Sequence, residues 1–157
     1  MIDEVMAKNN KLKLNEMEIT LTRFYYMLVM QVRRFFSEGK FTEQNQISLI
    51  RALDCRMVAE KIERVADILK RMEDIKNQEL NKLAAVIKDY YAKSFNSFIS
   101  SDYEKALTLR AYEKKEREGY EKFKAKARKS KDLPSYLQAN GLLQLMVYSK
   151  EISMLVR

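Results

Sequence analysis

At residues 54–69 the chain reads Asp54-Cys55-Arg56-Met57-Val58-Ala59-Glu60-Lys61-Ile62-Glu63-Arg64-Val65-Ala66-Asp67-Ile68-Leu69. Apolar residues recur in this stretch at steps of four and three, at Val58, Ile62, Val65 and Leu69. That alternation is typical of the seam along which a long helix packs in a bundle. The stretch therefore predicts one helix of an all-α protein.

Two acidic residues of this stretch, Glu63 and Asp67, lie one turn apart on the same face of the predicted helix. Like charges at this spacing repel by about 0.2–0.5 kcal/mol unless a cation lies between them. Arg64, Arg71 or Arg23 could supply that cation in structural ion pairs, and a metal ion could also do so. The residues alone leave both interpretations open.

Working outward, the same periodicity predicts five helices. We expect them at about residues 11–37, 42–75, 77–99 and 101–128, and from Asp132 to near the C-terminus. Thr42 is a reasonable N-cap for the second helix, residues 101–104 have the form of a capping box, and Asp132-Leu133-Pro134 is a typical start for the fifth. Because no Gly or Pro separates the second helix from the third, one continuous helix is an alternative to a turn near residues 73–78.

The short connections predict an antiparallel up-and-down bundle of about five long helices in one domain, residues 1–157. The last helix is apolar over a broad surface, which implies contacts on more than one side, and Gly141 within it allows close helix approach. An odd number of helices leaves one seam half covered. We therefore expect a homodimer, with the charge-poor last helix as its interface.

Composition limits the chemistry. The 157 residues include three glycines and one proline, too few for turn-rich folds, and no histidine. Cys55 is the single cysteine, so neither a disulfide framework nor a thiolate metal site is expected. A bound metal would have to take oxygen ligands, or be iron or manganese held by carboxylates. With no Gly-rich phosphate loop and no nucleophile–base pair, the protein is not expected to be an enzyme.

The net charge of +8 suits an acidic partner, an anionic surface or nucleic acid. Lys and Arg crowd residues 114–131, but Glu113, Glu116, Glu118 and Glu121 interrupt them, which favours a solvated helix over a surface that follows phosphates. The N-terminus has no signal-peptide pattern and no segment approaches a membrane span. A cytoplasmic location is expected.

The run Ile62-Glu63-Arg64-Val65-Ala66-Asp67 resembles the signature of the PhoU phosphate-uptake regulators, in which a bundle helix carries Ile/Leu-Glu-Arg-Ile-Gly/Ala-Asp. Residues 15–19 and 21–26 look like the helix before that motif, especially in archaeal PhoU-like proteins. Residues 91–95 and 102–106 look like the next helix pair. The similarity covers about residues 12–156, and its specific part is the Glu-Arg-x-x-Asp core.

The family is built from two three-helix halves, each with one acidic motif. The resemblance implies that this chain is a first half without its first helix, at about residues 11–75, followed by a complete half, at 76–157. In the second half, Leu143 and Val147 stand at the two carboxylate positions, so the second acidic site looks lost. Glu151 matches a later acidic position of the motif.

Acidic motifs of this family can hold metal clusters, with iron reported. The resemblance therefore implies three candidate ligands for iron or another divalent ion, Glu63, Asp67 and Glu60. One helix cannot fill a coordination sphere, so further donors would be needed, for which Glu16, Glu18 and Asp54 are candidates.

The resemblance also implies a regulator that works by protein contact, with the phosphate transporter's ATPase subunit or a sensor kinase as partner. The AbrB-type DNA-binding domain of archaeal relatives does not fit in residues 1–10, so regulation of DNA would need a separate subunit. Two alternatives stay open: a basic helical protein that binds nucleic acid, and a scaffold that only dimerises. The scaffold predicts that Glu63→Ala with Asp67→Ala leaves partner binding intact.

Overall fold

The computed structural model describes residues 11–38, 48–72 and 74–156. These residues form α2 (Lys11–Ser37), α3 (Leu49–Arg71), α4 (Gln78–Ser100), α5 (Tyr103–Lys129) and α6 (Leu133–Met154), with no strand among them. The predicted all-α bundle of five helices is confirmed. None of the described helices is long and apolar enough to cross a membrane.

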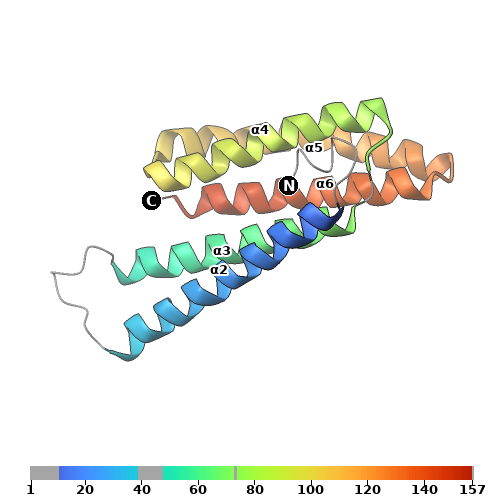
Figure 1. Ribbon diagram of the computed structural model, residues 1–157. Helices are drawn as coiled ribbons and strands as arrows, with labels where there is room; N and C mark the ends of the chain where they lie inside the picture. The colour runs from blue at the N-terminus through green and yellow to red at the C-terminus, as the bar shows by residue number, and fades with distance from the viewer. Residues whose placement is uncertain (1–10, 39–47, 73, 157) are drawn as a thin grey trace.

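Helix α6 lies in the middle of the bundle and contacts α3, α4 and α5 (Figure 1). Helices α4 and α5 cover one side of it and α3 the other, and consecutive helices run antiparallel. Helix α2 packs chiefly on α3, and the pair diverges from the other helices toward the end where α2 stops (Figure 1).

The broad apolar surface of α6 is used inside the chain. Leu142, Leu145 and Met146 are at most 2% exposed, and α6 contributes to both hydrophobic clusters of the core. Contacts on more than one side were predicted and are confirmed. That this helix also forms the interface with a second chain stays a prediction, although α3, α4 and α5 of the same chain already contact it.

Helices α3 and α4 are separate, as one of the two predicted alternatives has it. Helix α3 ends at Arg71 and not at Ile75, because Met72 has an extended backbone (φ −74°, ψ 134°). The Asn77 side chain then caps α4 by accepting hydrogen bonds from the backbone N–H groups of Glu79 (2.9 Å) and Leu80 (3.2 Å). An asparagine cap thus replaces the Gly or Pro that the sequence lacks here.

Two predicted caps need correction. Helix α3 begins at Leu49 with Ser48 as N-cap, whereas Thr42 lies outside the described residues. The N-cap of α5 is Asp102, which accepts from the Lys105 N–H at 2.9 Å, so the capping box that began at Ser101 is wrong by one residue. Ser101 instead has φ 53° and closes α4, since the chain reverses there within two residues. The predicted Asp132 cap of α6 is confirmed.

Candidate functional site on the α2–α3 pair

The acidic turn of α3 is held by arginines of the same helix. The Glu60 Oε1 atom accepts from Nη2 (2.8 Å) and Nε (3.0 Å) of Arg64, and Asp67 Oδ2 lies 3.5 Å from Arg71 Nη2. For Asp67 the structure thus contains a structural ion pair, which was one of the two interpretations, whereas Arg64 pairs with Glu60 and not with Glu63. Arg23 is on the exposed side of α2 and does not join them.

Glu63 is the exception, because it has no hydrogen bond or ion pair to any described residue. Its half-buried carboxyl group has a raised pKa, chiefly because of desolvation and then because of the Asp67 carboxylate. Arg64 opposes this shift, while Glu18 and Glu60 add to it. The ionised form of Glu63 is therefore less stable in the folded chain than in water, and a cation beside this carboxyl group would stabilise it.

Glu63 stands at the edge of an apolar groove between α2 and α3. The groove has a volume of about 380 Å³, and its lining comes from both helices: Leu21, Phe24, Tyr25, Met27, Leu28 and Gln31 of α2, and Ala59, Ile62 and Glu63 of α3. Phe24 and Met27 are 62% and 54% exposed. An acidic group beside exposed apolar side chains can receive a partner that offers both a cation and an apolar residue.

The candidate metal ligands do not converge into a ligand set. Glu18, a proposed further donor, pairs with Lys70 at 2.9 Å, while Asp54 is buried at 4% exposure and Glu16 is exposed. Among residues 11–38, 48–72 and 74–156, no three Asp, Glu, Cys or His side chains are grouped so that they could hold a metal ion. Metal binding at Glu63, Asp67 and Glu60 stays a prediction of the resemblance, and no step below depends on it.

The opposite side of α3 is anchored to α6. Lys61 Nζ lies 2.6 Å from Glu151 Oε2 and 5.5 Å from the ring centroid of Tyr148. Glu151, the residue matched to a later acidic position, is thus part of a structural ion pair. Leu143 is buried and Val147 is half-buried on α6. These two positions, which would carry the carboxylates of a second acidic motif, therefore take part in apolar packing.

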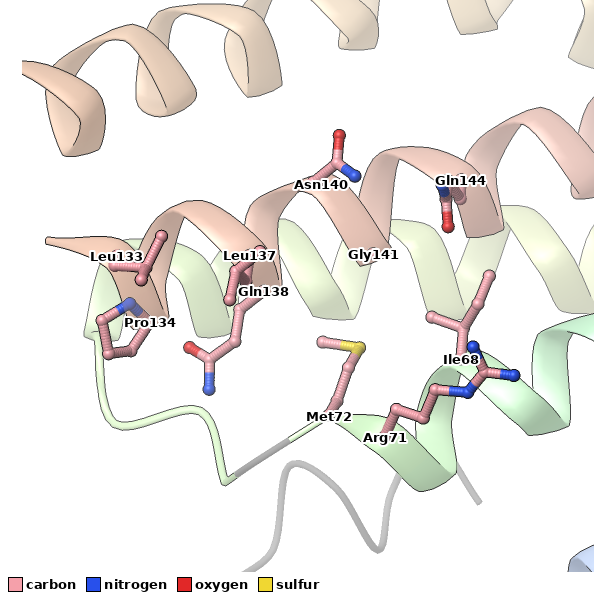
Figure 2. A pocket seen from close by; sticks show the side chains of 10 residues that line it. All are labelled: Ile68, Arg71, Met72, Leu133, Pro134, Leu137, Gln138, Asn140, Gly141 and Gln144. Atoms are coloured by element: carbon pink, nitrogen blue, oxygen red, sulfur yellow. The ribbon is translucent and has the colours of Figure 1, made fainter.

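A second hollow, which the sequence did not predict, lies where the end of α3 meets the start of α6 (Figure 2). Its volume is about 410 Å³, and its lining includes Met72, Leu137, Gly141 and Arg71. A Cβ atom on Gly141 would lie 3.3 Å from Ile68 Cγ2 and from Met72 Sδ, so this glycine permits the close approach of the two helices. Gly141 was the available signal in the sequence, but it indicates close packing and not a hollow.

Comparison of the chain with protein-family models, with curated proteins and with solved structures finds no match in any of the three.

Proposed function

We propose that this chain is a phosphate-uptake regulator of the PhoU type, which acts by contact with another protein and not by catalysis. The observation that carries the proposal is the position of the Glu-Arg-x-x-Asp core. Glu63 of that core lines the open groove between α2 and α3 and is not paired with any residue that the structure describes. Protein contact of this kind would take place in the cytoplasm.

The groove indicates what the partner must present. Its apolar floor suits one or two apolar side chains of a partner helix, and its acidic edge suits an Arg or Lys beside them. A partner cation near Glu63 would also offset the repulsion between Glu63 and Asp67. By the resemblance, the transporter's ATPase subunit or a sensor kinase would carry this surface.

A test in cells separates this role from a purely structural one. In a strain that lacks the chain, we expect phosphate uptake to stay high in phosphate-rich medium. The wild-type chain restores repression, whereas Glu63→Ala with Asp67→Ala does not. A matched variant, Glu104→Ala with Glu118→Ala, removes two exposed acidic residues of α5 and should restore it fully.

Two results would contradict the proposal. If loss of the chain leaves phosphate uptake unchanged, the phosphate role is wrong. If the Glu63→Ala/Asp67→Ala variant restores repression as well as the wild type does, the acidic core is not the contact. That result would favour the alternative that the chain is a scaffold that only dimerises.

One observation favours nucleic-acid binding as a second candidate function. Basic residues gather near Tyr136 where α5 turns into α6: Lys124, Arg128, Lys129 and Lys131. Part of this charge is already used, because Lys124 Nζ lies 3.5 Å from Glu121 Oε2 and 5.8 Å from the Tyr136 ring centroid. Binding to duplex DNA should weaken steeply as salt rises, and a chain that shows no anisotropy change with DNA at low salt would exclude this function.

A further inference from the structure

Within the part of the chain that the structure describes, one uncovered surface lies on the outer face of α2, the side turned away from α3. Large apolar residues are exposed there, with Ile19 at 48%, Tyr26 at 61% and Met30 at 69% exposure. Glu16, Arg23 and Arg33 are exposed between and beside them. Large apolar residues gathered on one exposed helix face are typical of an interaction site.

The exposed residues form a second heptad seam. Glu16, Ile19, Arg23, Tyr26, Met30 and Arg33 follow one another at steps of three, four, three, four and three. This is the a/d spacing with which one helix packs against another. The spacing favours a partner helix as the occupant over a lipid surface, which needs a broad apolar face and no register.

The charges along this seam are self-complementary in one direction only. In an antiparallel pair of α2 helices, a positions meet d positions, so Glu16 of one copy faces Arg33 of the other. In the same register Ile19 faces Met30, and Arg23 faces the ring of Tyr26, a favourable cation–π arrangement. A parallel pair would instead bring each of the three charged residues against its own equivalent.

We propose that two copies of this chain associate through the outer faces of their α2 helices, antiparallel, with Glu16 of each copy paired to Arg33 of the other. Such an isologous contact forms each pair twice about a two-fold axis. It relocates the expected dimer interface from α6 to α2. The groove that holds Glu63 is a different surface of the α2–α3 pair, so the dimer does not depend on the phosphate role.

Sedimentation equilibrium of the full chain, over a concentration series at moderate salt, tests the dimer. We expect a dimer whose dissociation constant rises at least tenfold in Glu16→Arg and in Arg33→Glu. The double variant Glu16→Arg/Arg33→Glu keeps the net charge and exchanges the partners, so it should restore dimerisation. Arg117→Glu, at an exposed position of α5, makes the same charge change as Arg33→Glu and should leave the dissociation constant unchanged.

Disulfide trapping tests the direction. In a Cys55→Ser background, Ile19→Cys together with Met30→Cys should give a disulfide-linked dimer on mild oxidation, and Ile19→Cys alone should not. Far-UV circular dichroism confirms that each variant is folded. A wild-type chain that is monomeric at every concentration, or that is monomeric and binds anionic vesicles, would overturn the proposal. It would also be overturned if neither Glu16→Arg nor Arg33→Glu changed the dissociation constant, or if the Ile19→Cys variant alone formed a disulfide-linked dimer.

Discussion

Leu145→Ala tests the central position of α6 in the bundle. Leu145 is 0% exposed and lies in the main hydrophobic cluster, surrounded by residues of the neighbouring helices. Truncation of such a leucine removes its transfer free energy and leaves a cavity, which together cost about 2–5 kcal/mol. Since the free energy of unfolding of a domain is about 5–15 kcal/mol, this is a large part of the total.

The matched control is Leu137→Ala, on the same helix, where the side chain is 58% exposed. Its truncation should change the free energy of unfolding by no more than about 0.5 kcal/mol. Urea denaturation followed by circular dichroism at several protein concentrations measures both. Leu145→Ala should lower the midpoint strongly and independently of concentration. Equal effects at the two positions, or a loss at Leu145 that appears only at high dilution, would mean that α6 lies at an interface between chains.

Three other predictions follow from single residues. Gly119→Ala should raise the free energy of unfolding by about 0.5–1 kcal/mol, because alanine favours a helix and its Cβ would lie 3.9 Å from the nearest atom, Leu83 Cδ2. Thermal melting measures this change, and a lower melting temperature would contradict it. Arg110→Met should lower the free energy of unfolding by about 1–3 kcal/mol, because Arg110 Nη2 donates a hydrogen bond of 2.6 Å to the Ser153 carbonyl near the end of α6. Urea titration measures this, and an unchanged midpoint would show that the bond does not stabilise the end of the helix. The raised pKa of Glu63 means that the folded state holds this proton more firmly than the unfolded state does. The contribution of Glu63 to the free energy of unfolding is therefore fully present below the ordinary pKa of 4.5 and is lost as pH rises through the raised pKa. Across that pH range the wild type should lose stability relative to Glu63→Gln, and parallel curves of unfolding free energy against pH would refute the shift.

The number and type of the helices could be predicted from the sequence because apolar periodicity is local. The steps from Val58 to Leu69 and the Asp132 cap need no knowledge of other helices. The role of α6 could not be predicted in the same way. A broad apolar surface says that something covers a helix, and only the tertiary arrangement says whether that cover belongs to the same chain.

The candidate site was predictable to a similar degree. Spacing alone places Glu63 and Asp67 on one face of α3, but which acidic residue pairs with an arginine depends on side-chain geometry. The arginines pair with Glu60 and Asp67, and Glu63 has no such pair among the described residues. The rotation of α2 about its axis was also unpredictable, and it turns Arg23 away from the acidic turn. The second seam on α2, with Ile19, Tyr26 and Met30 at heptad spacing, was not predicted, because only burial shows which face of a helix is left uncovered.

The most direct measurement of the proposed contact is the affinity of the purified chain for the phosphate transporter's ATPase subunit from the same cell, by biolayer interferometry. We expect binding that weakens at least tenfold in Glu63→Gln/Asp67→Asn, which keeps the shape of both side chains and removes their charge. Glu104→Gln/Glu118→Gln should bind as the wild type does. Equal affinity of all three proteins would contradict the assignment of the contact to the acidic turn of α3, and absence of binding by the wild type would contradict the choice of this partner.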